Sequence, residues 1–137
     1  LLLEGRWQIT PALSVQGNYT WTEAEIASGT FDGKDVPYVS PHTAAISSNW
    51  SIGAGFSLFG EFVYNSSRYE AGDNANTLAK ADSEGLVNIA LRWERGPWHA
   101  SLRGNNVLGE EYNSYSNIYG EYPAPKQVLF LSAGYTL

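Results

Sequence analysis

Four tyrosines near the C-terminus are the residues best suited to binding chemistry, and they are Tyr112, Tyr115, Tyr119 and Tyr122. A tyrosine ring offers a broad, stiff contact surface with a polar hydroxyl at its tip, so several rings on one loop suit the recognition of a ligand. The competing interpretation is that these rings pack the loop against itself or lie at the boundary of an apolar layer. The sequence leaves both interpretations open.

Arg68 and Tyr69 form a second candidate site, at the end of a predicted strand. A cation beside exposed loops attracts an anionic ligand through its long-range field. The alternative is an ordinary solvated charge at the rim of a sheet. Both residues are therefore candidate ligand contacts.

Catalytic and metal-binding constellations do not stand out in the sequence. His42 and His99 are expected on different strands, and a zinc site needs several ligands that converge. The spacing of a calcium-binding loop is not found among the acidic loop residues Asp32, Asp35 and Asp73. Cysteine is absent, which removes thiolate ligands and cysteine nucleophiles. We predict no enzymatic activity, no cofactor and no metal site.

The composition limits the partners and the kind of fold. The 137 residues carry a net charge of −6, and this balance argues against nucleic-acid binding, which needs clustered Lys and Arg. An aromatic content of 14% with a mean hydropathy of −0.27 is typical of strands with one apolar and one polar face. No apolar run approaches the roughly 18 residues that a membrane-spanning helix needs.

The organisation of the chain predicts one structural unit, because no shift in composition marks an internal boundary. The chain begins at Leu1, contains no Met and shows no secretory signal. These features predict a fragment or a processed product of a longer protein.

The last strand supplies the clearest secondary-structure pattern. Alternate residues lie on one face of a strand, so one apolar stripe is formed by Leu129, Leu131, Ala133, Tyr135 and Leu137. A bacterial outer-membrane β-barrel ends in this way, although the edge strand of a soluble sheet shows the same alternation. The rest of the chain must decide between the two.

The alternation recurs along the whole sequence. It is clean at residues 1–9, 13–22 and 87–94, and weaker at 42–52, 56–66 and 98–106. With the terminal strand this makes about seven strands, each near the roughly 9 to 11 residues that a tilted strand needs to cross a bilayer. The predicted fold class is all-β.

The connections alternate strictly between short and long. Short turns are expected at residues 10–12, 52–54 and 95–97, and long polar loops at about 27–40, 70–83 and 107–126. Outer-membrane barrels have this asymmetry, with short periplasmic turns and long extracellular loops. A β-sandwich has no reason to sort its loops by length.

Aromatic residues mark two rims in this arrangement. Five lie near the short turns or the C-terminus, and they are Trp7, Trp50, Trp93, Trp98 and Tyr135. Four lie toward the long loops, and they are Tyr19, Trp21, Tyr64 and Tyr69. Rows of Trp and Tyr at both interfaces are typical of membrane barrels. The alternative is that each Trp caps a soluble core.

The segment from Gly104 to Tyr112, with the sequence GNNVLGEEY, resembles the V-x-N-L-F-D-x-x-Y signature near the end of TonB-dependent outer-membrane receptors. The following Tyr122–Gln127 stretch resembles their Y-x-x-P-G-R segment. Lys126-Gln127 replaces the usual Gly-Arg, and Leu137 replaces the usual terminal Phe. The resemblance covers the whole chain in pattern and is specific over roughly residues 102–137.

This resemblance implies a C-terminal segment, residues 1–137, of an antiparallel transmembrane β-barrel of about 22 strands. The N-terminal plug domain, with its TonB-contacting segment or TonB box, and the earlier strands would be absent. The implied location is the bacterial outer membrane, and the implied function is energy-coupled uptake of a scarce ligand. A ferric siderophore is the leading ligand, with cobalamin and haem as less common ones.

The implied partners are outer-membrane lipid, the TonB energy-transducing complex reached through the plug, and the ferric siderophore. The barrel assembly machinery would read the terminal stripe as its signal. Arg68 would attract an anionic iron chelate, and the tyrosines would contact it. Charged residues facing the lumen would hold the barrel wall against the plug, and they are Glu4, Arg6, Glu61, Arg92, Glu94 and Arg103.

Three alternatives remain open. A small self-contained outer-membrane barrel acting as an adhesin or anchor needs an even strand number, and an eighth strand is not visible. A barrel-domain lipase or protease needs Ser, His and an acid to converge at one rim. A soluble lectin-like sandwich would stay monomeric without detergent.

Overall fold

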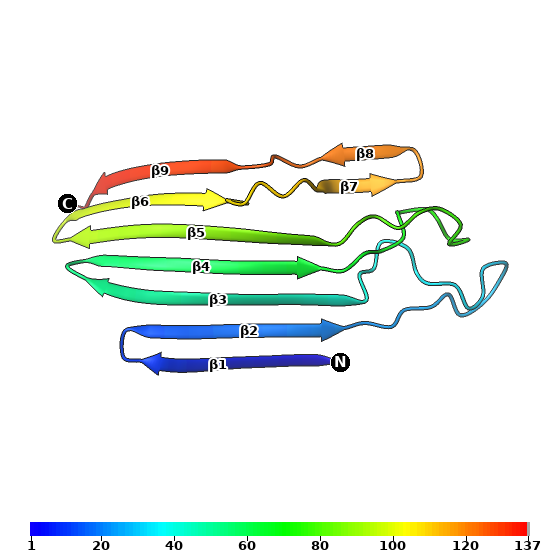
Figure 1. Cartoon of the computed structure of the whole chain (residues 1–137), viewed down its shortest axis with the longest axis horizontal. Helices are drawn as coiled ribbons and strands as arrows, with labels where there is room; N and C mark the ends of the chain where they lie inside the picture. The colour runs from blue at the N-terminus through cyan, green and yellow to red at the C-terminus, as the bar shows by residue number, and fades with distance from the viewer. Residues whose placement is uncertain (137) are drawn as a thin grey trace.

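The chain folds into β-strands throughout, as a computed structural model that describes residues 1–136. The strands are β1 Leu2–Thr10, β2 Leu13–Trp21, β3 His42–Gly53, β4 Phe56–Asn65, β5 Glu84–Arg95, β6 Trp98–Asn105, β7 Asn113–Asn117, β8 Gly120–Pro123 and β9 Val128–Tyr135. Seven of them form one antiparallel sheet in the order β1-β2-β3-β4-β5-β6-β9 (Figure 1). In the described part of the chain no helix is long and apolar enough to cross a membrane.

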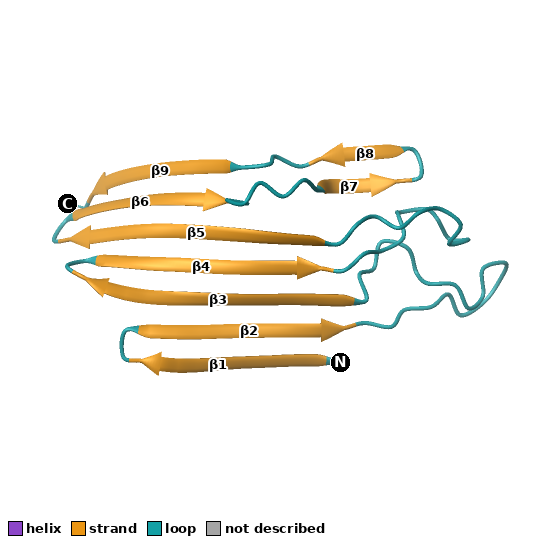
Figure 2. Cartoon of the chain, in the orientation of Figure 1, coloured by secondary structure: helices purple, strands orange, loops and turns teal. Residues whose placement is uncertain are grey.

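The large sheet confirms the predicted all-β fold, because its seven strands coincide with the seven segments of alternating sequence. The remaining two strands, β7 and β8, form a separate hairpin inside the long connection between β6 and β9 (Figure 2). The sequence predicted a loop over this region. The described sheet is open, so β1 and β9 are its two edges.

The register places the alternating apolar stripes of the seven strands on one face, while a few apolar residues such as Phe59, Val63 and Phe130 lie on the other. Trp50 is paired with Leu13 on one side and Leu58 on the other, and Leu91 is paired with Leu58 and Leu102. Paired residues of an antiparallel sheet point to the same side. The apolar stripes of neighbouring strands therefore merge into one continuous surface, called here the apolar face.

The opposite face is polar across most of its width. One row crosses five strands and runs through Arg6, Gln16, Ser47, Glu61 and Asn88. The Asn88 side chain donates to the Glu61 carboxylate at 2.9 Å. A sheet with one apolar and one polar face is built to separate two different environments.

The sheet is a single layer among the described residues. Each strand packs only against its neighbours in the sheet, and Ala90 is the one hydrophobic residue there that is buried. Leu129 and Leu131 on the apolar face expose 73% and 81% of their surface. Burial of such side chains is worth roughly 1.5–3 kcal/mol each, so this face requires apolar surroundings.

Short turns lie at one end of the sheet and long connections at the other (Figure 1). Gly96 and Pro97 join β5 to β6, and Gly96 has the positive φ of 59° that a tight hairpin turn requires. The turns are also tied to neighbouring strands, since Ser51 N–H donates to Ala12 O and Thr136 N–H donates to Pro97 O, both at 2.8 Å.

Aromatic residues line the short-turn end of the apolar face, as predicted. The rings of Trp98 and Tyr135 meet edge to face at 4.8 Å, and those of Phe56 and Trp93 lie 6.3 Å apart. At the other end Tyr19 stacks on His42, with its hydroxyl 2.7 Å from Nδ1. Two aromatic rows therefore border the apolar face.

Candidate functional site

Three long loops meet at one end of the sheet (Figure 1). Loop A (residues 22–41) joins β2 to β3, loop B (66–83) joins β4 to β5, and loop C (106–127) joins β6 to β9 and contains the β7–β8 hairpin. Loops A and B are linked because Asp35 N–H donates to Asn76 Oδ1 at 2.7 Å and Asn76 Nδ2 donates to Asp35 O at 3.1 Å.

Loops B and C are linked by a short piece of parallel pairing. Ala71 N–H donates to Ser116 O at 3.3 Å, and Ile118 N–H donates to Ala71 O at 3.1 Å. Gly72, next to this pairing, has a positive φ of 93°, a backbone conformation that favours glycine. The β7–β8 hairpin is thereby fixed against loop B.

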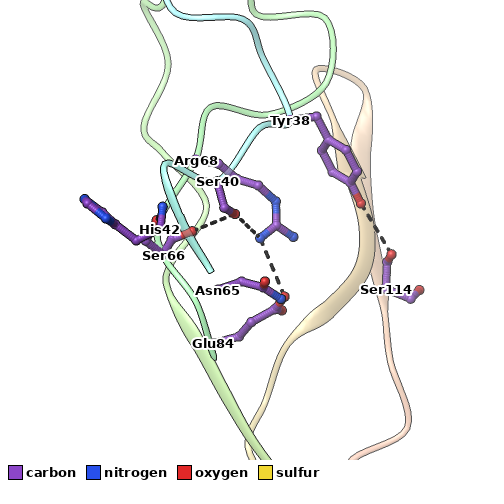
Figure 3. A network of polar contacts seen from close by, with 8 residues as sticks. All are labelled: Tyr38, Ser40, His42, Asn65, Ser66, Arg68, Glu84 and Ser114. Atoms are coloured by element: carbon purple, nitrogen blue, oxygen red, sulfur yellow. Dashed lines mark hydrogen bonds and ion pairs between the residues drawn. The ribbon is translucent and has the colours of Figure 1, made fainter. Parts of the chain in front are cut away.

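Arg68 lies at the centre of a polar network (Figure 3). Its Nη1 lies 3.6 Å from Glu84 Oε1, and the two side chains are only 13% and 12% exposed. The same Nη1 donates to Ser40 Oγ at 3.2 Å, and Asn65 Nδ2 donates to Glu84 Oε1 at 2.8 Å. The charge of Arg68 is therefore compensated within the protein.

Tyr38 contacts both other loops. Its ring lies 5.1 Å from Arg68 Cζ, within the range of a cation–π contact, and 5.2 Å from the ring of Tyr115. Its N–H donates to Tyr69 O at 2.8 Å, and its hydroxyl donates to Ser114 O at 3.4 Å. Tyr38 adopts these contacts with a positive φ of 64°, which is uncommon for a residue with a Cβ.

The structure brings some of the predicted tyrosines together and separates others. Tyr115 and Tyr122 lie 5.8 Å apart on facing strands of the hairpin, and Tyr119 at its tip is 92% exposed. Tyr112 is half-buried at the base of the hairpin. Tyr69 lies in loop B under the ammonium group of Lys80, which is 4.5 Å from its ring.

A cleft of about 260 Å³ separates loop B from loop C. Its charged lining is mostly acidic, and includes Arg68, Lys80, Glu70, Asp82, Glu84 and Glu121. Such a lining supplies many hydrogen-bond acceptors and few free donors. The cleft is open to solvent at the loop end of the sheet.

Two carboxylates in the loops are held in their ionised form. Burial alone would raise the pKa of Asp73, but hydrogen bonds from the N–H groups of Leu78 and Thr77 outweigh it and lower the pKa below the ordinary value. The hydrogen bond and positive charge of Lys126 lower the pKa of Glu111. Asp73 fastens the turn of loop B, and Glu111 fastens the base of loop C.

The segment that resembles the family signature forms a tight turn directly after β6. Asn106 is 4% exposed and has a positive φ of 49°. Its side chain accepts from Glu110 N–H at 2.9 Å and donates to Glu110 O at 2.8 Å, while its own N–H donates to Asn88 Oδ1 at 3.0 Å. Asn106 therefore fixes the backbone of the turn through its side-chain hydrogen bonds, and its observed role is structural.

The terminal stripe lies on the apolar face, where β9 pairs with β6. Its described members are aligned with apolar partners, as in Leu131 with Leu102 and Tyr135 with Trp98. Leu129 and Ala133 share the same face, and Leu137 lies outside the described residues. The use of this stripe as an assembly signal stays a prediction.

Chemical groups for catalysis or metal binding do not gather in the described residues. No cluster of three or more His, Asp or Glu side chains in residues 1–136 is able to hold a metal ion. His42 lies at the loop end of β3, whereas His99 lies beside the turn at the other end of the sheet. The arrangement offers recognition by hydrogen bonds, aromatic surface and charge.

Sequence reasoning missed the residues that organise the loops. Tyr38, Ser40 and Glu84 come from three segments far apart in the chain, so no local pattern links them. A weak signal existed for Asn106, because an Asn that follows a strand and precedes a glycine turn favours a left-handed backbone.

The two-faced sheet, its aromatic rows and its loops sorted by length define a segment of an antiparallel transmembrane β-barrel. The family model described as TonB dependent receptor-like, beta-barrel, matches residues 1–107, and the chain belongs to this family. The match ends at residue 107, inside the signature-like segment, so the family rests mainly on the strands rather than on that segment. No curated protein sequence matches the chain significantly.

Solved receptors share this fold. The siderophore receptor PiuA from Acinetobacter baumannii aligns with 98% of this chain and 21% of its own, with a TM-score of 0.84 and 17% identity. The ferric-catecholate import receptor Fiu from E. coli K12, in its closed form, aligns with 96% of this chain and 20% of its own, at TM-score 0.81 and 24% identity. The ferric yersiniabactin uptake receptor FyuA from Yersinia pestis aligns with 96% of this chain and 22% of its own, at TM-score 0.79 and 20% identity. The chain spans about a fifth of the length of these receptors.

Proposed function

We propose that this chain forms the C-terminal part of the barrel of an outer-membrane receptor that imports a ferric siderophore with energy supplied by a TonB complex. The observation that carries the proposal is membership of the TonB-dependent receptor-like barrel family over residues 1–107. The names of the similar solved receptors, which refer to siderophores and ferric chelates, support the choice of ligand.

The open sheet supports a place within a larger barrel. Edge strands carry unpaired N–H and C=O groups, which are costly in a membrane. We propose that β1 pairs with an earlier strand of the same polypeptide and that β9 pairs with the first strand of the barrel. The polar face then lines a lumen that holds the plug, through which TonB acts, and the apolar face contacts lipid.

The loop end of the sheet is the proposed ligand-binding side. Tyr115, Tyr119 and Tyr122 expose 41%, 92% and 57% of their surface, so the hairpin presents aromatic surface with hydroxyl groups to an approaching chelate. Tyr112 and Tyr69 border the same region. The stripe of β9 would serve the barrel assembly machinery during insertion.

Uptake assays on the complete gene test this proposal. A deletion strain is grown under iron limitation with ferric citrate, a ferric hydroxamate or a ferric catecholate as the sole iron source. We expect lost growth on at least one source, restored by the complete gene and abolished again by deletion of TonB. If the deletion strain shows unchanged growth and ⁵⁵Fe uptake on a wide panel of ferric chelates, the proposal that the ligand is a ferric chelate is rejected. If the complete gene restores growth without TonB, energy coupling is rejected.

A hairpin variant tests the ligand-binding side separately. Replacement of residues 113–123 by a short Gly-Ser linker removes β7 and β8 but leaves the seven strands of the sheet. We expect normal outer-membrane levels with reduced uptake. A Gly-Ser replacement of residues 28–32 at the tip of loop A is the matched control, and equal loss in both variants would contradict a specific role for the hairpin.

A further inference from the structure

Tyr38 and Arg68 lie where the three long loops meet (Figure 3). We propose that they are positioning residues that couple loops A, B and C into one cap, so that a side chain in loop A controls the conformation of the hairpin in loop C. The importance of this coupling for ligand binding rests on the proposed function. The coupling itself is a property of the loops and is testable without a ligand.

Each pair of loops is joined by direct contacts, which closes a triangle. Loop A reaches loop B through the Tyr38 N–H bond to Tyr69 O, and again through the Asp35–Asn76 hydrogen bonds. Loop A reaches loop C because the Tyr38 ring packs on Tyr115. Loop B reaches loop C through the Ala71 pairing described above. Each loop therefore contacts both of the others, so a change in one loop reaches the other two directly.

The guanidinium of Arg68 fixes this triangle to the sheet. It is paired with Glu84, the first residue of β5, and it also reaches Ser40 at the end of loop A. Its planar group lies over the Tyr38 ring, a geometry that favours Arg over Lys. With its charge paired and its side chain only 13% exposed, Arg68 orients the loops instead of presenting a free charge to an anionic chelate.

Hydrogen–deuterium exchange of the ligand-free, full-length receptor in detergent tests the coupling. Tyr38→Leu removes the ring that contacts Arg68 and Tyr115. We expect exchange at least tenfold faster in both loop B and the β7–β8 hairpin, with the sheet unchanged; tenfold corresponds to about 1.4 kcal/mol. Tyr38→Phe keeps the ring contacts with Arg68 and Tyr115 and loses only the hydroxyl bond to Ser114 O, so we expect loop B to exchange as in the unmodified receptor.

The matched control is Thr30→Ala, at the exposed tip of loop A. We expect it to leave loops B and C unchanged. The double variant Tyr38→Leu/Arg68→Gln should accelerate exchange by less than the product of the two single effects, because both single variants remove the same contact between Tyr38 and Arg68. Faster exchange confined to loop A in Tyr38→Leu, or additive effects in the double variant, would show that the loops are independent and would overturn the proposal.

A binding measurement separates positioning from direct charge recognition. The probes are ferric citrate, a ferric hydroxamate and a ferric catecholate. Tyr38→Leu keeps the charge of Arg68, yet we expect it to weaken binding of each bound probe as much as Arg68→Gln does, with the number of sites unchanged. A loss seen only with Arg68→Gln and only for anionic probes would assign Arg68 to ligand contact instead.

Two further outcomes keep the test decisive. If Tyr38→Leu does not assemble, Arg68→Lys takes its place, because it keeps the charge and loses the planar group; unchanged exchange in loops A and C would then refute the coupling. If none of the three probes binds the unmodified receptor, the proposed function fails for these ligands, while the exchange data still decide the coupling.

Discussion

Asn106 offers a quantitative test of how the turn after β6 is held. Asn106→Ala removes the two side-chain hydrogen bonds to Glu110 and places Ala at a φ of 49°. Two hydrogen bonds contribute about 1 kcal/mol each, and the left-handed backbone costs a residue with a plain Cβ roughly 1 kcal/mol more. The expected local destabilisation is about 3 kcal/mol.

Two companion variants separate these contributions. Asn106→Gly also removes the hydrogen bonds but tolerates the positive φ, so it should cost only about 2 kcal/mol. Asn105→Ala is the control at the neighbouring residue. The Asn105 side chain accepts from Arg103 Nε at 2.8 Å on the polar face, so its removal leaves the hydrogen bonds of the turn intact. It should cost less than about 0.5 kcal/mol in the turn.

Exchange of the amides in this turn is the assay, in the full-length receptor. Val107 N–H bonds to Val87 O and Gly109 N–H to Asn106 O, both at 2.9 Å, so both report opening of the turn. The expected acceleration is about 150-fold for Asn106→Ala and about 30-fold for Asn106→Gly. Equal rates in these two variants would refute the backbone contribution, and rates equal to those of the unmodified protein would refute the whole account.

Three further predictions concern the turns, the loops and the membrane face. Gly55→Ala should reduce outer-membrane levels because its Cβ would overlap a backbone carbonyl of β5, whereas Gly53→Ala, also at positive φ but facing open space, should be milder on immunoblots. The pKa of Asp73 is lowered on folding, so its stabilisation of loop B is present at neutral pH and is lost as pH falls below about 4. Below that pH, exchange of the Thr77 and Leu78 amides that are bonded to Asp73 should accelerate. Asp73→Asn should remove this pH dependence. Leu131→Arg on the apolar face should cost about 2–4 kcal/mol in barrel stability, while Ser132→Arg on the polar face should be tolerated. Urea unfolding in lipid measures both variants. Similar losses of stability in the two variants would contradict the assigned faces.

The strands were predictable because each one alternates between two environments. Along Val87, Ile89, Leu91 and Trp93 every second residue is apolar, and the register observed for β5 follows from matching that stripe to its neighbours. The short turns were predictable from glycine and proline. These features are local, and the chain itself carries their pattern.

The loop cap was not predictable from the sequence in the same way. The hairpin strands consist largely of Asn, Ser, Tyr and Gly, so no apolar stripe marks them. The contact of Tyr38 with Arg68 and Tyr115 joins residues from three loops, and long-range contacts leave no periodic trace. The tyrosines were identified as candidates, but the contact of Tyr115 with Tyr38 was not.

The order of strands in the sheet has a consequence for folding speed. Every pairing in the sheet except β6 with β9 joins strands that are consecutive in the chain. Hairpins of this kind form locally and quickly, and the entropy lost on closing a loop grows only slowly with its length. Inside loop C the β7–β8 hairpin brings the two ends of the connection closer before β9 docks. Of the pairings in the described sheet, β9 with β6 therefore closes the longest connection, residues 106–127.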